Sequence, residues 1–325
     1  IHKYLRELNE ATFGTDAEII TVGEMSSTTM ENCYQYANED GKELSMVFSF
    51  HHLKVDFMGN EKWVIVPFDF QKLKKILFDW QVNMGKHHAW NAVFWCNHDQ
   101  PRVVSRFGNV EKYWKESAKM LGTVIHCLRG TPYIYQGEEL GMTNAGFTDI
   151  SQYKDVESLN HFRILQEKGL TEENAYQILQ IHSRDNSRTP MQWTSGENGG
   201  FTTGEPWIEV NKNCSYINAE AELQAEDSIF HYYQKLIALR KEYDVIAYGE
   251  LKPLDEKNPS VFAYEREYQG EKMLVICNFY GKEVTWDSET ELGEYQCVLS
   301  NYEVHNIEGS RIGLKPYEAV VLYKK

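Results

Sequence analysis

Short apolar runs alternate with longer amphipathic segments from the start of the chain to residue 247. Four runs rich in β-branched and aromatic residues predict strands, at 19–24, 44–50, 90–96 and 131–136. Three segments with apolar residues at helical spacing predict helices, at 70–80, 114–129 and 228–242. Strands and helices that alternate in this way predict βα units and a parallel sheet, so we expect an α/β fold.

For two of these helices, single residues indicate where the helix begins and which side faces the core. Asp69 stands directly before the first of these helices, where its carboxylate is expected to cap the free backbone N–H groups. In the third helix, Ile229, Tyr233, Leu236 and Ile237 are expected to face the core.

Beyond residue 248 the pattern changes to period two. Residues 260–268 and 272–280 alternate in polarity around a Gln269-Gly270 turn, and this pattern is typical of a β-hairpin. Further strands are expected at 295–301 and 319–323. We therefore predict two domains, an α/β domain over 1–247 and an antiparallel β domain over 248–325.

Two stretches do not fit a plain βα repeat. The connection between the fourth strand and the last helix is long, so we expect an elaborated loop region with short helices around 172–181. Residues 1–9 have the pattern of an amphipathic helix with Leu5 and Leu8 on one face, but no residue before it caps its first turn and no Met begins it. We therefore expect the chain to begin partway through a fold.

Two carboxylates stand at predicted strand ends. Glu24 ends the first strand, and Asp99 follows the third strand directly after His98. A single acid at such a place is more often a helix cap or a solvated loop residue. Two of them at the ends of parallel strands indicate the C-terminal face, where (β/α)8 barrels have their active sites. Because glycosidic bond cleavage uses several carboxylates, the pair also suggests a glycosidase.

Five longer strings carry a family resemblance: Thr21–Thr28, Phe48–Asp56, Phe94–Gly108, Gly130–Glu139 and Ser183–Trp193. Together they resemble the oligo-1,6-glucosidase group of the α-amylase clan of retaining glycosidases, and within it the trehalose-6-phosphate hydrolases. The resemblance extends over the whole chain. It implies that residues 1–247 form the C-terminal half of a (β/α)8 barrel, strands 5 to 8, followed by a small antiparallel β domain.

The resemblance also implies roles for single residues. Glu24 matches the general acid/base, and Asp99 matches a third acid that orients hydroxyls of the distorted sugar and stabilises its positive charge. His98 matches a hydroxyl ligand in the same subsite. Arg188 matches an arginine that binds hydroxyls of the cleaved glucose, and Arg102 is expected to support that subsite as a further substrate-binding residue.

Retaining chemistry needs a second carboxylate as the nucleophile. In the family this aspartate belongs to an Arg-x-Asp motif on the fourth barrel strand, which we expect upstream of Ile1. The loop that binds the group's usual calcium is expected upstream as well, so we assign no metal and no cofactor to this chain. The 325-residue polypeptide alone is expected to lack hydrolase activity.

The expected substrate is a small phosphorylated disaccharide. Lys54, helped by His52 or Lys62, is expected to hold the 6-phosphate of the leaving glucose. From the residues alone, a solvated basic loop explains this cluster equally well, and the resemblance favours the phosphate site. The enzymatic alternative is an oligo-1,6-glucosidase or dextran glucosidase acting on isomaltose-type oligosaccharides.

A second alternative is a non-catalytic relative of the clan that serves as an interaction module. Retention of Glu24, His98, Asp99 and Arg188 argues against it, because the decay of a site usually spares fewer of its parts. A half barrel would expose an unpaired strand on each side, so we also expect self-association through these edges.

Composition narrows the partners and the location. The net charge of -15, from 33 basic and 48 acidic residues, argues against nucleic acid or an anionic membrane. The six cysteines form no CxxC pair, and several stand in apolar runs that are typical of buried reduced thiols. We find neither a signal peptide nor an apolar run of about 18 residues, so a cytoplasmic location is expected.

Overall fold

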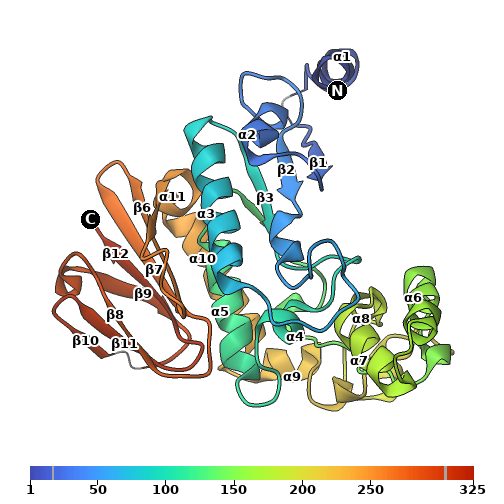
Figure 1. The fold of residues 1–325 in the computed structure, drawn as a ribbon. Coiled ribbons are helices and arrows are strands. Elements are labelled where there is room, and N and C mark those ends of the chain that lie inside the picture. Colours follow the sequence, from blue (N-terminus) through green and yellow to red (C-terminus); the bar gives the residue numbers. More distant parts are fainter. Residues whose placement is uncertain (17, 304–305) are drawn as a thin grey trace.

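A four-stranded parallel sheet lies at the centre of the N-terminal part of the molecule (Figure 1). The computed structural model describes residues 1–16, 18–303 and 306–325. The strands stand in chain order: β1 (Val22–Met25), β2 (Met46–Ser49), β3 (Asn91–Phe94) and β4 (Thr131–Tyr133). All three neighbouring pairs are parallel, so the four predicted strands and their parallel arrangement are confirmed.

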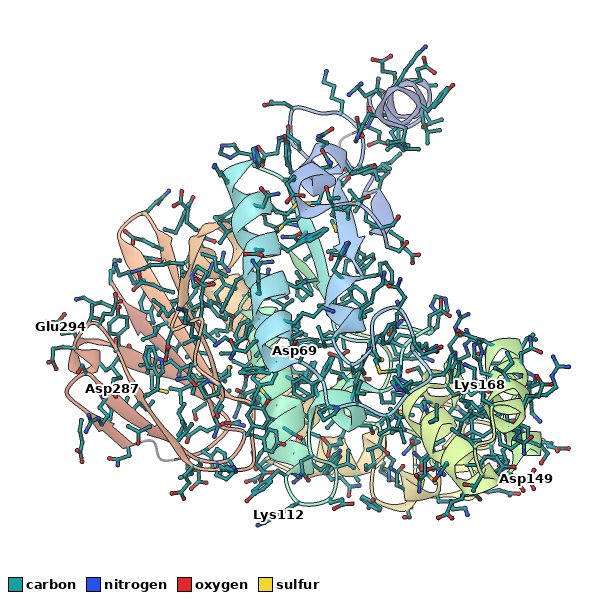
Figure 2. All side chains as sticks on the ribbon, viewed as in Figure 1. Asp69, Lys112, Asp149, Lys168, Asp287 and Glu294 are labelled. Carbon is teal, nitrogen blue, oxygen red and sulfur yellow. The ribbon has the colours of Figure 1, made fainter. Side chains whose placement is uncertain are left out.

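Three long helices cover one side of this sheet: α3 (Phe70–Lys86), α5 (Trp114–His126) and α10 (Ile229–Glu242). As predicted, Asp69 caps α3, because its carboxylate accepts a hydrogen bond of 2.9 Å from the backbone N–H of Lys72. Figure 2 labels Asp69 at this helix end. Ser228 caps α10 in the same way, through the N–H of His231. These caps fix where each helix begins relative to the preceding strand or loop.

One predicted core position of α10 is wrong. Ile229, Tyr233 and Leu236 are buried, but Ile237 is 39% exposed. Adjacent helix positions are separated by about 100° around the axis, so the residue next to the buried Leu236 turns towards solvent.

Shorter helices occupy the ends and the long connection. The α-helices are α1 (His2–Ala11), α2 (Met30–Cys33), α4 (Val103–Phe107), α6 (Val156–Glu167), α7 (Glu172–His182), α8 (Asp185–Arg188), α9 (Ala219–Gln224) and α11 (Asp244–Tyr248). The 3-10 helices are η1 (Tyr34–Tyr36), η2 (His51–Lys54), η3 (Glu138–Leu140), η4 (Ile150–Gln152), η5 (Glu197–Gly200), η6 (Lys212–Ser215) and η7 (Leu292–Glu294). The helix predicted around 172–181 is α7. Among the described residues, no helix has the length and apolar character needed to cross a membrane.

The C-terminal part consists of two antiparallel sheets. The larger has the order β5-β6-β7-β12-β9, and the smaller has the order β10-β11-β8. Their bounds are β5 (Glu250–Leu254), β6 (Val261–Tyr268), β7 (Glu271–Asn278), β8 (Val284–Asp287), β9 (Gln296–Ser300), β10 (Asn306–Glu308), β11 (Arg311–Leu314) and β12 (Ala319–Lys324). The predicted antiparallel domain is confirmed. Gln269 and Gly270 both have positive φ, as a tight two-residue hairpin turn requires.

Strands β6 and β7 are buried on both faces. On one face Phe262 and Val275 join a core that contains Leu77 of α3 and Val124 of α5. On the other face Ala263 and other small or branched side chains pack against the smaller sheet. The predicted boundary between residues 247 and 248 falls inside α11, and the two parts share one hydrophobic core across it.

Helix α1 lies at the edge of the molecule beside β1 and α2 (Figure 1). None of its residues is buried, and polar contacts attach it: His2 and Arg6 both reach the carboxylate of Glu43, at 2.8 and 3.0 Å. The nearby Ile20 is 68% exposed. This edge of the sheet therefore carries exposed apolar side chains.

Candidate active site

A cavity of about 220 Å³ opens at the C-terminal ends of the parallel strands. Its walls combine a carboxylate, a histidine and several aromatic rings: Glu24, Phe48, Phe50, Phe94, Cys96, Asn97, His98, Tyr133, Ile134 and Tyr135. The structure thus brings the predicted Glu24 and His98 into one cavity, although 74 positions separate them in the chain.

The strand register produces this arrangement. Glu24 lies opposite Phe48 in the β1–β2 pair, and Glu24 itself is exposed. Phe48 in turn contacts Phe94 and Tyr133 edge to face, with ring centroids 4.9 and 4.6 Å apart. Aromatic rings beside a carboxylate provide flat apolar surfaces for a sugar ring and a proton donor or acceptor beside it.

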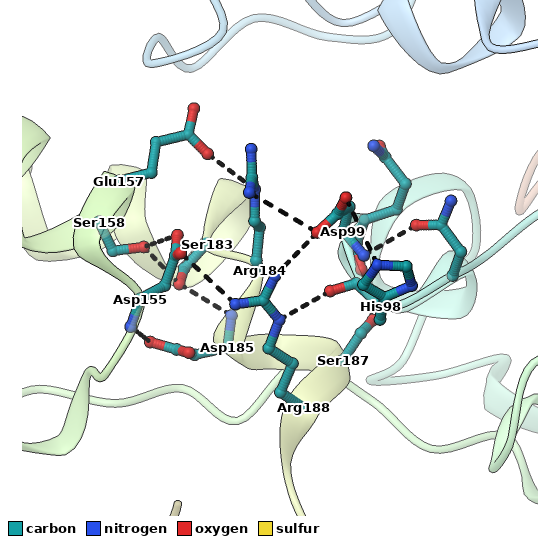
Figure 3. A network of polar contacts seen from close by, with 12 residues as sticks. His98, Asp99, Asp155, Glu157, Ser158, Ser183, Arg184, Asp185, Ser187 and Arg188 are labelled. Atoms are coloured by element: carbon teal, nitrogen blue, oxygen red, sulfur yellow. Dashed lines mark hydrogen bonds and ion pairs between the residues drawn. The ribbon is translucent and has the colours of Figure 1, made fainter. Parts of the chain in front are cut away.

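Asp99 lies in the loop after β3, next to His98. Figure 3 shows its carboxylate between two arginines, with Arg188 Nη2 at 2.7 Å and Arg184 Nη1 at 3.6 Å. His98 Nε2 lies 3.6 Å from the other carboxylate oxygen. The backbone N–H of Asp99 donates to the side chain of Asn97 at 2.8 Å, and this bond shapes the turn that presents the acid.

Arg188, at the end of α8, has all three guanidinium nitrogens in contact with acceptors. Besides Asp99, it donates through Nε to the His98 carbonyl at 2.9 Å and approaches Asp155 Oδ1 at 3.4 Å (Figure 3). Its side chain remains 23% exposed. The predicted residues His98, Asp99 and Arg188 therefore meet in one place, and their catalytic roles stay predictions.

Sequence reasoning missed the charged residues that continue this network. Glu157 pairs with Arg184 at 2.9 Å and with Lys62 at 3.1 Å. Burial opposes the ionisation of Glu157, but Lys62 and Arg184 hold its pKa below the usual value. Arg184 stands in a string that the family resemblance already marked, whereas Glu157 has no signal in the sequence beyond its place in a predicted loop region.

The surroundings of Lys62 are less suited to a phosphate than the prediction assumed. Burial lowers the pKa of its ammonium group, and only 18% of the side chain is exposed. Since it already pairs with Glu157, its charge is partly neutralised.

The prediction that His52 helps to hold a phosphate is wrong. His52 is 4% exposed, and its Nε2 lies 3.0 Å from the carbonyl of Phe94. Burial lowers the pKa of the ring to about 3, so it is neutral near pH 7. His52 packs against Phe94 and Trp95 as a part of the core.

Lys54, in contrast, is exposed and lies close to the strand ends. Its ammonium group donates to the carbonyl of Ser26 at 3.0 Å, two residues after Glu24. The buried ion pair between Arg106 and Asp56 supports this segment, because Arg106 also donates to the carbonyl of Leu53. A fixed backbone beneath an exposed cation is a suitable arrangement for an anion ligand.

The prediction that Arg102 binds substrate is also wrong. Arg102 is 2% exposed and does not line the cavity. Its guanidinium donates to the backbone carbonyls of Gln136, Asn186 and Ser187 instead. Its contribution to the site is therefore indirect.

Among the described residues, no three His, Cys, Asp or Glu side chains gather so that they could hold a metal ion. Glu24 is the one carboxylate among the cavity-lining residues of that part of the chain. The arrangement can thus supply one acid/base group, hydroxyl ligands and an arginine-held carboxylate beside them.

Comparison with known proteins explains this combination. The family model for the α-amylase catalytic domain matches residues 1–249, and the model for the C-terminal domain of the α-amylase SusG matches residues 261–321. The chain belongs to the α-amylase family. The parallel sheet with its helices therefore corresponds to part of the barrel of α-amylase catalytic domains, and the predicted fold class is confirmed.

Three similar proteins of the α-amylase family are named as a hydrolase or a glucosidase. Trehalose-6-phosphate hydrolases from Bacillus subtilis and Escherichia coli are 53% and 49% identical, over 99% and 98% of this chain. An oligo-1,6-glucosidase from Bacillus cereus is 48% identical over 100% of it. The chain spans 58% of the length of each of these relatives.

A solved structure agrees with these sequence comparisons. The trehalose-6-phosphate hydrolase of Bacillus licheniformis superposes with a TM-score of 0.96 at 52% identity, over 99% of this chain and 59% of that one. The isomaltulose synthase of Klebsiella reaches 0.92 at 33% identity. The same backbone thus occurs in members of the α-amylase family with different names.

Proposed function

We propose that this chain forms the acid/base side of the active site of a retaining α-glucosidase that hydrolyses trehalose 6-phosphate to glucose and glucose 6-phosphate. The observation that carries this proposal is the shared cavity of Glu24 and His98, with the Asp99–Arg188 pair directly beside it. The two trehalose-6-phosphate hydrolase relatives support the choice of substrate.

Glu24 acts first as a general acid that protonates the oxygen of the departing sugar, and then as a general base that takes a proton from water. Its exposure at the mouth of the strands lets it reach a substrate oxygen. Phe48, Phe94 and Tyr133 provide the apolar walls against which a glucose ring stacks.

Asp99 orients hydroxyl groups and stabilises the positive charge that develops on the cleaved sugar. Arg188 holds Asp99 in place through its 2.7 Å contact, and the remaining exposed part of the guanidinium is available to a hydroxyl. The 3.4 Å contact with Asp155 brings a second carboxylate to the guanidinium and adds to the attraction that fixes its orientation.

The nucleophile of the proposed reaction is a second carboxylate about 5 to 5.5 Å from Glu24. Since Glu24 is the one carboxylate among the described cavity residues, we propose that polypeptide beyond the printed 325 residues contributes it. The 325-residue chain alone is then inactive, and a chimera in which it follows the part of the Bacillus subtilis relative that it does not cover is active.

For the phosphate we propose Lys54 as the main ligand. The test compares Lys54→Ala with Lys86→Ala, an exposed lysine in the last turn of α3, in this chimera. Lys54→Ala should raise KM for trehalose 6-phosphate about 10-fold or more, the cost of one charge-assisted hydrogen bond, and leave KM for an uncharged aryl glucoside unchanged. Equal effects on both substrates would refute the role of Lys54.

The oligo-1,6-glucosidase of Bacillus cereus supports a second candidate, cleavage of isomaltose-type oligosaccharides. The pairing of Lys62 with Glu157 favours it, because a neutralised cation next to a carboxylate suits hydroxyl groups better than a phosphate. Turnover of isomaltose by the chimera at a rate above that of trehalose 6-phosphate would select this candidate.

We further propose a cytoplasmic location and self-association. All six cysteines are free thiols, as a reducing compartment maintains them. Val22 of the edge strand β1 and Ile20, two residues before it, are exposed, so a second copy can pair with this edge. Cell fractionation tests the location, and a monomer in light scattering of the 325-residue chain would contradict the association.

A further inference from the structure

Arg102 is a buried cation whose hydrogen bonds go to backbone carbonyls. Its Nη1 donates to Gln136 at 2.6 Å, its Nε to Asn186 at 3.1 Å and its Nη2 to Ser187 at 3.5 Å. Burial lowers the pKa of the guanidinium. Burying a charge costs free energy, and an apolar side chain at this position would avoid that cost. The presence of an arginine here therefore needs an explanation.

The three carbonyls belong to two segments that border the site. Gln136 follows β4, directly after the cavity residue Tyr135. Asn186 and Ser187 are the two residues before Arg188 in α8. Arg102 itself stands three residues after Asp99, so one guanidinium joins the segments that carry Asp99, Tyr135 and Arg188.

Further contacts reinforce the junction at Ser187. Its hydroxyl donates to the carbonyl of Gln100, and the Tyr135 hydroxyl donates to the Ser187 carbonyl at 2.8 Å. The thiol of Cys96, just beyond the end of β3, lies 3.4 Å from the Ser187 hydroxyl. The backbone N–H of Arg102 donates to the side chain of Asn144 at 2.9 Å, which also anchors the backbone of Arg102.

Glu138 is buried beside Arg102, and the neighbouring Glu139 is half-buried. Glu138 lines a small internal cavity together with Arg102, and its carboxyl accepts a hydrogen bond of 3.0 Å from Tyr233 of α10. Glu139, when ionised, attracts the guanidinium electrostatically, whereas burial raises the pKa of Glu138 to about 8 and keeps most of that carboxyl protonated at pH 7. Among the described residues, the three carbonyls rather than a close ion pair therefore hold the guanidinium in place.

We propose that Arg102 is a positioning residue, which fixes the backbone of Arg188 relative to Asp99 by holding the two carbonyls that precede Arg188. When Arg102 is replaced, the carbonyls of Asn186 and Ser187 lose the guanidinium that donates to them. The Arg188 side chain then no longer holds a single position relative to the Asp99 carboxylate. A displacement of about 1 Å at a catalytic group costs roughly 100-fold in rate.

The chain offers a matched control in Arg266. This arginine is also buried and also donates to backbone carbonyls, those of Cys127 at 2.8 Å and Gly249 at 2.6 Å. It lies on β6, and both carbonyls that it holds belong to residues outside the site. Arg102→Met and Arg266→Met therefore remove equivalent buried donors from the site and from a purely structural location.

The experiment measures kcat, KM and melting temperature of Arg102→Met, Arg102→Lys and Arg266→Met. It uses the chimera, because the positioning role rests on the proposed function and needs an active enzyme to be measured. Both Met variants should lower the melting temperature. Arg102→Met should lower kcat about 100-fold with KM changed less than about 3-fold, and Arg102→Lys, which keeps the charge but loses the fork, should recover part of that loss. Arg266→Met should keep kcat within about 2-fold.

The outcomes separate two failures. An unsubstituted chimera that folds but cleaves neither trehalose 6-phosphate nor isomaltose overturns the proposed function. If it is active and Arg102→Met keeps a kcat equal to that of Arg266→Met, the positioning role is refuted. Should Arg102→Met not fold, Arg102→Lys decides: an unchanged kcat refutes the role, and a loss of about 10-fold or more that exceeds that of Arg266→Met supports it.

Discussion

The two parts of this molecule use polar groups in opposite ways. At the C-terminal ends of β1 and β3, Glu24 is exposed and the side chain of Asp99 is 40% exposed, and a network of charged contacts holds the acid. In the β domain, β6 and β7 are buried on both faces by apolar packing. The difference teaches that the β domain contributes packing free energy, whereas the strand ends keep solvated groups to which we assign the proposed chemistry.

The largest expected effect separates these contributions at Glu24. Glu24→Gln in the chimera should lower kcat/KM for trehalose 6-phosphate by about 10²- to 10⁴-fold, because a general acid/base is removed. An aryl glucoside whose leaving group needs little protonation should lose much less. The control is Glu265→Gln on β6, a carboxylate of the β domain that should keep activity within about 2-fold. Similar losses in both variants would contradict the comparison.

In the β domain the expected effect is on stability. Ile276, fully buried on β7, packs between the two sheets. Ile276→Ala should lower the free energy of unfolding of the 325-residue chain by about 2 to 5 kcal/mol, through lost apolar contact and the cavity that remains. Urea unfolding measures this change. If Ile276→Ala altered kcat of the folded chimera as strongly as Glu24→Gln does, the assignment of separate contributions would fail.

Glu138, buried beside Arg102 and Tyr233, predicts a pH dependence of stability. Burial raises its pKa from 4.5 to about 8, so the folded state prefers the protonated carboxyl. The stability that it contributes is present below about pH 4.5 and is lost as the pH rises towards 8. Melting temperatures between pH 5 and 8 should therefore fall less in Glu138→Gln than in the unsubstituted chain. Parallel pH profiles would show that Glu138 titrates normally.

The smallest expected effect is at a helix end. Asp69→Ala removes the cap of α3 and should cost about 1 kcal/mol of unfolding free energy, without a change in kcat. Asp69→Asn is the matched control, because its side-chain oxygen can still accept the bond from Lys72. A full loss in Asp69→Asn would assign the effect to charge rather than to the hydrogen bond.

Much of the architecture could be predicted from periodicity, because it reflects local alternation of apolar and polar residues. The four parallel strands and the β6–β7 hairpin were all visible in this way. The short strands β5, β8, β10 and β11 were not predicted, since each depends on pairing with a neighbour rather than on its own pattern.

For the site, sequence reasoning identified the residue types but not their burial. His52 and Lys54 stand two positions apart, but one is in the core and the other is exposed, and only the packing of η2 against Phe94 and Trp95 decides which. Arg102 was recognised through its motif, yet its direction inward depends on carbonyls of residues 136, 186 and 187. Contacts between segments far apart in the chain leave no local pattern.

The core that Phe262 and Val275 share with Leu77 and Val124 has a consequence for engineering. Truncation of the chain before β5 would remove the β domain from α3 and α5 and expose an apolar surface on both helices. A design that moves the α/β part into another protein should therefore include the β domain, or replace the apolar side chains on the outer sides of α3 and α5 with polar ones.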